Sequence, residues 1–177
     1  GISCCVAMSM PQVHIVAYCS DLGYGSARGA EMLALMLAGG ALTRVVSGFV
    51  ADYIGGVRTL LIGSILQAVA LVFYLPFDGL ASLYVISLMF GIAQGGIVPS
   101  YAIIVREYMK ARIAAERVGF LIMMTIVGMG FGGWFSGWIY DYTGSYMAAF
   151  AHGIAWNILN VAIMILILTK TRLPLRA

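Results

Sequence analysis

The chain has 177 residues, of which 62% are hydrophobic and only 10% charged, and its formal net charge is +3. Soluble domains carry roughly 45–50% apolar and about 25% charged residues, so a water-soluble fold of this length could not bury so much apolar surface. The basic residues do not form a nucleic-acid-binding patch. The composition therefore predicts an all-α integral membrane protein whose solvent is the lipid bilayer.

Long uncharged stretches predict six membrane-spanning helices, since a helix needs about 20 apolar residues to cross the hydrocarbon layer. The first stretch contains Gln12 and His14, and the second contains Glu31, Arg44 and Asp52. The alternating strands of a membrane barrel are absent from the sequence. The expected spans are residues 1–19, 29–53, 59–77, 80–105, 118–140 and 142–169.

Basic residues fall on one face of the membrane if the six helices alternate in direction, and the opposite face holds only Arg28. The positive-inside rule places the basic face in the cytoplasm, together with both ends of the chain. The short loops favour a bacterial inner membrane. The residues on the basic face are Arg58, Arg106, Lys110, Arg112, Arg117, Lys170, Arg172 and Arg176.

A ten-residue sequence recurs after 89 residues: "SGFVADYIGG" at 47–56 and "SGWIYDYTGS" at 136–145. Three crossings separate the copies, so the same turn is expected at opposite faces of the membrane. This arrangement predicts two inverted three-helix repeats, which are typical of secondary transporters. The alternative is two similar tight turns without a structural relation.

Each copy of the turn has the same three expected roles. A glycine lets a neighbouring helix approach closely, an aspartate stands at the helix end, and a second glycine ends the helix with a positive φ. The corresponding pairs are Gly48 and Gly137, Asp52 and Asp141, and Gly55 and Gly144.

The stretch "GFVADYIGGVR" resembles the cytoplasmic loop signature of the major facilitator superfamily, in which Gly48, Asp52, Gly55 and Arg58 fit and Tyr53 replaces a basic residue. "GWIYDYTGSYMAAF" resembles that family's junction between its last two helices, and "EYMKARIAAERVG" resembles its long basic loop. The resemblance implies that residues 1–177 form the C-terminal six-helix half of a twelve-helix carrier. The missing N-terminal half would then supply the other wall of the substrate cavity.

Arg44 lies inside the second expected span, where a charge costs at least about 2.5 kcal/mol unless it faces water or a partner. One interpretation is a structural gate, in which Arg44 reaches the interface or pairs with Asp52. The other is binding of an anionic substrate, such as a carboxylate, by the guanidinium. "TRVVSGFVAD" resembles the eighth helix of monocarboxylate and oxalate–formate carriers, where an arginine contacts the organic anion. Gly40 stands where monocarboxylate carriers have an aspartate, and residues 118–140 lack the lysine of oxalate–formate carriers.

Four other polar residues are candidate substrate contacts. His14 and Tyr18 lie one turn apart in "HIVAY", which resembles the seventh helix of the monocarboxylate-like branch. His14 is expected to contact substrate or carry a proton, or to be a packed imidazole bonded to a neighbouring helix. Gln94 and Tyr101 in "GIAQGGIVPSYA" are expected to hold helices together, with a substrate role as the alternative.

The sequence has none of the enzyme motifs His-Glu-x-x-His or Gly-x-Ser-x-Gly, and it predicts no enzyme, cofactor or metal site. Cys4, Cys5 and Cys19 lack metal-ligand spacing and are expected to act as small apolar residues. The predicted function is secondary transport of a small solute, such as a monocarboxylate, by alternating access, with proton coupling left open. The alternatives are a carrier for an unrelated substrate and a structural or pore-forming six-helix subunit.

Overall fold

The computed structural model describes residues 1–170, apart from the side chain of residue 111, and this part of the chain is a bundle of helices. Arg172 and Arg176, two of the residues expected on the basic face, lie outside the described residues. The helices are α1 (Ile2–Asp21), α2 (Ser26–Ile54), α3 (Gly56–Phe73), α4 (Leu80–Gly95), α5 (Ile97–Tyr108), α6 (Ala111–Thr143) and α7 (Tyr146–Lys170).

Six helical segments are long and apolar enough to cross a membrane, which confirms the predicted number. The fourth, Leu80–Tyr108, consists of α4 and α5 with an interruption at Gly96. The break falls in the glycine-rich stretch "GIAQGGIVPSYA". The loops after α1, α2 and α5 are shorter than expected, because the helices run further into them than the apolar stretches alone indicate. The loop between α3 and α4 is longer, because α3 ends at Phe73 and not at residue 77.

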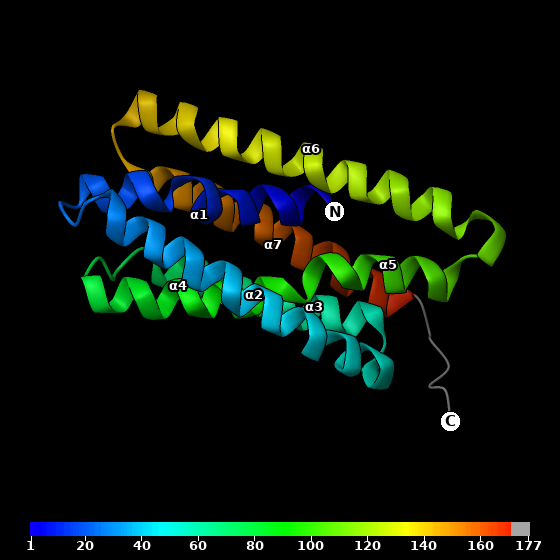
Figure 1. Ribbon diagram of the computed structural model, residues 1–177. Helices are drawn as coiled ribbons and strands as arrows, with labels where there is room; N and C mark the ends of the chain where they lie inside the picture. The colour runs from blue at the N-terminus through cyan, green and yellow to red at the C-terminus, as the bar shows by residue number, and fades with distance from the viewer. Residues whose placement is uncertain (171–177) are drawn as a thin grey trace.

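Successive spans run in opposite directions (Figure 1). The turns after α1, α3 and α6 lie together at one end of the bundle, which we call the Gly144 end. The turns after α2 and α5 lie at the other end, called the Gly55 end. The repeated turn therefore occurs once at each end of the bundle, as the inverted repeat predicts.

The two most extensive helix contacts are α2 with α4 and α1 with α6. These contacts correspond when α1 is matched to the α4–α5 span, α2 to α6 and α3 to α7. Each is built on glycine: a Cβ on Gly91 would lie 2.2 Å from the Met36 carbonyl oxygen, and one on Gly132 would lie 2.3 Å from the Ser9 hydroxyl. Small residues of this kind let helix backbones approach within a bilayer. The packing thus has the symmetry of two inverted three-helix units.

Glycine also ends the matched helices α2 and α6. Gly55 has φ 85° and Gly144 has φ 65°, a region that side chains with a Cβ rarely adopt. The first glycine of each copy of the repeated turn, Gly48 or Gly137, has different surroundings in the two copies. A Cβ on Gly137 would touch His14 at 3.4 Å, whereas one on Gly48 would meet nothing within 4 Å. Within residues 1–170 no neighbouring helix approaches Gly48, so the close approach expected there stays a prediction.

The core lies along α1, α3 and α4, while α2, α6 and α7 expose much of their surface. On α2, Val45 and Phe49 are each 65% exposed, and on α6 Ile126 and Trp134 are each 65% exposed. Exposed apolar side chains of this kind suit contact with lipid or with another apolar protein surface. The matched helices α2 and α6 thus both expose large apolar surfaces, and α7 is buried to the same extent as they are.

Candidate functional site

The middle of α1 directs two polar side chains towards different neighbours. Gln12 Nε2 donates a hydrogen bond of 2.7 Å to Gln94 Oε1 on α4. His14 Nε2 lies 2.9 Å from the carbonyl oxygen of Gly133 on α6. Because a carbonyl oxygen only accepts, Nε2 carries the proton of this bond, and Nδ1 is the ring nitrogen left to take up another. We call the Gln12–Gln94 contact the amide bridge.

Arg44 is the most deeply placed charge among the described residues. It lies ten residues from Ile54 and eighteen from Ser26 in α2, its side chain is exposed, and it makes no ion pair in the described part of the chain. Gly40, one turn earlier, faces α4, where its Cβ would lie 3.7 Å from Gln94 Nε2. Arg44 therefore lies about one helical turn from the amide bridge.

The two tyrosines among the predicted substrate contacts lie inside the bundle. Tyr18 is 7% exposed and packs edge-on against Tyr146 and Phe150 of α7, with ring centroids 5.5 and 5.4 Å apart. Tyr101 is 4% exposed and lies beside the Cys4 thiol. The structure thus groups Arg44 with Gln94, places His14 against α6, and buries both tyrosines.

The charged motif residues stand at helix ends. Asp52 and Arg58 are exposed at the Gly55 end, and Asp141 is exposed at the Gly144 end. Asp52 makes no ion pair with the loop between α5 and α6 in the described structure. Instead, the carboxylate of Glu107 in α5 accepts the Gly56 N–H at 3.2 and 3.3 Å and so occupies the start of α3.

The Gly144 end is held by carboxylates. Arg28 and Glu31 form an ion pair of 3.0 Å, and the Tyr84 hydroxyl of α4 also donates to Glu31. The Tyr140 hydroxyl of α6 donates to Asp21 at the end of α1. These bonds join the same helix pairs, α2 with α4 and α1 with α6, that pack most extensively.

Several contributors to the site were not singled out by sequence reasoning. Gln12 is a polar residue in an apolar span, two positions before His14, and this was a visible signal for a buried partner. The Gly133 carbonyl and the role of Glu107 had no sequence signal, because both depend on which helices become neighbours. Within α7, Trp156 Nε1 donates to His152 Nε2 at 2.8 Å.

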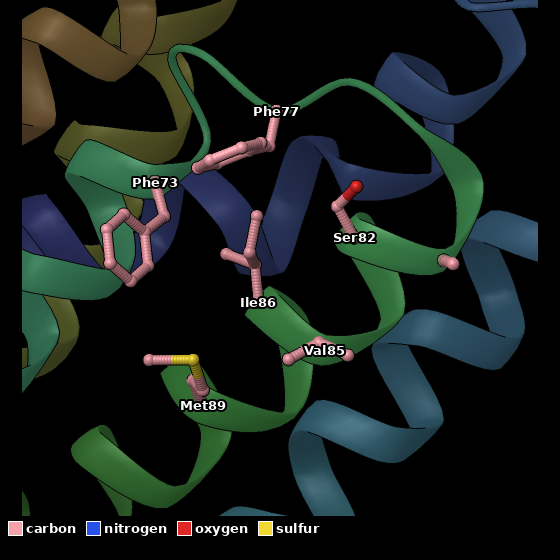
Figure 2. Close-up of a pocket in the computed structure, with 7 residues that line it drawn as sticks. Phe73, Phe77, Ser82, Val85, Ile86 and Met89 are labelled. Atoms are coloured by element: carbon pink, nitrogen blue, oxygen red, sulfur yellow. The ribbon is translucent and has the colours of Figure 1, made fainter.

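Two cavities lie outside this region, and neither is lined by Arg44 or by the amide bridge. One, of about 390 Å³, lies between α3 and α4 and is lined by Phe73, Phe77, Ala81, Ser82, Val85, Ile86 and Met89. Figure 2 shows that aromatic, aliphatic and thioether groups surround it, with Ser82 as the polar side chain. The other, of about 420 Å³, lies between α1, α5 and α6 and has Arg117 as its one charged lining residue. No set of three potential metal ligands gathers within residues 1–170.

Six antiparallel spans in two inverted units, with a cation in mid-span and an amide bridge beside it, define a helical membrane protein of the transporter class. The sequence model of the Major Facilitator Superfamily matches residues 2–176. The chain belongs to this superfamily, in agreement with the resemblance carried by its repeated turn.

Two curated relatives are similar to the chain. Monocarboxylate transporter 13 of Rattus norvegicus is 27% identical over 158 residues, and the protein of the same name from Bos taurus is 26% identical over 158 residues. Each alignment covers 88% of this chain and 37% of the relative. The chain thus spans little more than a third of the length of these relatives.

Proposed function

We propose that the chain forms part of a secondary carrier for a small organic anion such as a monocarboxylate, and that Arg44 binds the anionic group. The observation that carries the proposal is Arg44 itself: an exposed, unpaired guanidinium deep in an apolar helix. Within a bilayer such a group is stable only beside water or a partner of opposite charge. A carboxylate that accepts two parallel guanidinium hydrogen bonds meets this requirement. The names of the two relatives support the same substrate class.

The amide bridge supports a substrate-binding site around Arg44, because it adds polar groups to the single charge. Gln12 and Gln94 together offer more amide hydrogens and lone pairs than their single mutual bond uses, and both lie near Arg44. They could orient an anion that Arg44 holds. His14, with Nδ1 left to take a proton, would couple proton movement to transport.

The rest of the carrier is proposed to cover α2 and α6. Those helices expose large apolar surfaces, and the relatives are much longer than this chain. Transport would then proceed by alternating access, as a second six-helix half rocks against this one around Arg44. The bacterial inner membrane and the cytoplasmic location of the Gly55 end remain predictions.

The test is uptake of labelled pyruvate by the full-length carrier in proteoliposomes. Arg44→Gln should lower apparent affinity about 10- to 100-fold, the effect of losing a charged hydrogen-bonding partner of about 1.5–3 kcal/mol. Arg44→Lys should restore only part of the loss, because an ammonium lacks the planar fork. Arg112→Gln, which removes the same charge from the exposed start of α6, should leave uptake unchanged.

The rival functions give different results in the same assay. A pore would show neither saturation nor accelerated exchange when unlabelled pyruvate is loaded on the opposite side. A carrier for an unrelated solute would transport no pyruvate. Wild-type pyruvate uptake by correctly inserted Arg44→Gln protein would contradict the assignment of Arg44.

A further inference from the structure

Six polar side chains lie inside the bundle, away from Arg44 and the amide bridge, and all are at most 4% exposed. They come from α1, α3, α5 and α7. Two contacts tie them together: Asn160 Nδ2 donates to Ser64 Oγ at 2.8 Å, and the Cys4 thiol donates to Gln67 Oε1 at 3.7 Å. We call this group the polar cluster: Cys4, Ser64, Gln67, Tyr101, Asn157 and Asn160.

The helix register brings Gln67 and Asn157 to the same level. The helices α3 and α7 are antiparallel, and the Ser64–Asn160 bond joins them. Gln67 is three residues further along α3, and Asn157 is three residues back along α7, so each lies one turn nearer the Gly144 end on the facing side. Both side chains are 0% exposed.

The contact between α1 and α7 brings Cys4 to this level as well. Gly153 of α7 faces α1, where its Cβ would lie 3.7 Å from the Ala7 carbonyl oxygen. One turn from that point, towards the Gly55 end, lie Asn157 on α7 and Cys4 on α1. Asn157 therefore lies opposite both Cys4 and Gln67, which themselves are in contact.

Several polar atoms of the polar cluster have no protein partner in the described structure. These atoms are Gln67 Nε2, the Tyr101 hydroxyl and both Asn157 amide atoms. A fully buried amide without partners costs about 1–3 kcal/mol. In native proteins such groups are satisfied by ordered water, which needs two to four polar partners. The atoms without partners include both hydrogen-bond donors and acceptors. A water molecule needs both kinds, because it donates and accepts hydrogen bonds.

We propose that the polar cluster is an internal water-binding site, in which a water molecule accepts from Gln67 Nε2 and donates to Asn157 Oδ1. The Cys4 thiol and the Tyr101 hydroxyl border this site. It is separate from the substrate region, because α1 presents Cys4 more than two turns from Gln12. The bound water would complete the contact of α7 with α1 and α3 in the middle of the bundle.

Radiolytic hydroxyl-radical labelling of the full-length carrier in lipid nanodiscs, read by mass spectrometry, tests the site, because radicals form from bound water. Tyr101 and Cys4 should be labelled several-fold more than Tyr74 and Cys19. Tyr74 is 0% exposed and bonded to Ser87, and Cys19 is 0% exposed and bonded to Met32. Tyr146, at 8% exposed, controls for access from bulk water, because it should be labelled less than Tyr101 despite its greater exposure.

An apolar substitution then distinguishes labelling by the bound water from labelling by water that enters the bundle from outside. Asn157→Leu should reduce the labelling of Tyr101 and Cys4 to that of Tyr74 and Cys19, while Asn157→Ser, which keeps a polar atom, should retain it. If Tyr101 in the wild-type carrier were labelled no more than Tyr74, the proposal would be wrong, whatever the fate of the variants. Unchanged Tyr101 labelling in folded Asn157→Leu protein would overturn it as well.

Discussion

At the scale of single residues, two ionisable side chains inside the spans differ in their surroundings. Arg44 has neither an ion-pair partner nor a burying neighbour in the described structure, whereas His14 is half-buried and bonded to the Gly133 carbonyl. A histidine tied to a backbone acceptor through one nitrogen has a defined tautomer. Its other nitrogen then becomes the site for proton uptake, which makes His14 the better candidate for coupling and Arg44 the better candidate for anion binding.

His14→Ala is expected to flatten the pH dependence of pyruvate uptake, because His14 is the proposed proton carrier. The alanine cannot take up a proton, so any acceleration at low pH that depends on His14 would disappear. The measurement is initial uptake rate against external pH in proteoliposomes. His152→Ala is the matched control, because His152 is bonded to Trp156 within α7 and should leave the profile unchanged. A wild-type profile in His14→Ala protein would remove its role as proton carrier.

At the scale of helices, glycine decides how closely the spans pack. Gly91 and Gly132 stand where a Cβ would collide with the neighbouring helix, whereas Gly130 has nothing within 4 Å of its Cβ position. Glycines only two residues apart on α6, Gly130 and Gly132, therefore have opposite roles, because they lie on opposite faces of the helix. Because close backbone contact is the main source of helix association in lipid, the first kind of glycine holds the inverted repeats together.

Gly91→Ala is expected to destabilise the protein by about 1–3 kcal/mol, because α2 and α4 must separate to admit the methyl group. Gly130→Ala should be neutral or stabilising by up to about 1 kcal/mol, since alanine has the higher helix propensity and meets no neighbour. The difference is measured as the midpoint of thermal unfolding in detergent. Equal midpoints for the two variants would contradict the close packing of α2 on α4.

At the scale of the whole molecule, the arrangement of charges predicts the orientation. The Gly55 end carries most of the described basic residues, and the Gly144 end has Arg28 with several carboxylates. The positive-inside rule therefore predicts that the Gly55 end lies in the cytoplasm. The six antiparallel spans require the turns at each end to lie on one side of the membrane.

Two engineered cysteines test this orientation. Asp78→Cys, in the exposed loop between α3 and α4, should react with a membrane-impermeant maleimide in intact cells. Met109→Cys, between α5 and α6, should react only after the membrane is permeabilised. The native Cys4, Cys5 and Cys19 are 0% exposed and should contribute little background. The reverse pattern would show that the Gly55 end lies outside.

The amino-acid sequence by itself determined the membrane class, the six spans, the inverted repeat and the glycine turns at Gly55 and Gly144. These features follow from local requirements: apolar length for a crossing, and a missing Cβ where the backbone has a positive φ. The superfamily was also readable, because its signature lies in one continuous stretch of chain.

Only the tertiary structure decided which side chains meet. Gln12 contacts a residue 82 positions away, His14 contacts one 119 positions away, and Tyr101 turns into the core rather than towards Arg44. The physical reason is that membrane helices are apolar on all sides, so the hydrophobic pattern does not mark the buried face as it does in water. The rotation and register of each helix depend instead on small-residue packing with its neighbours.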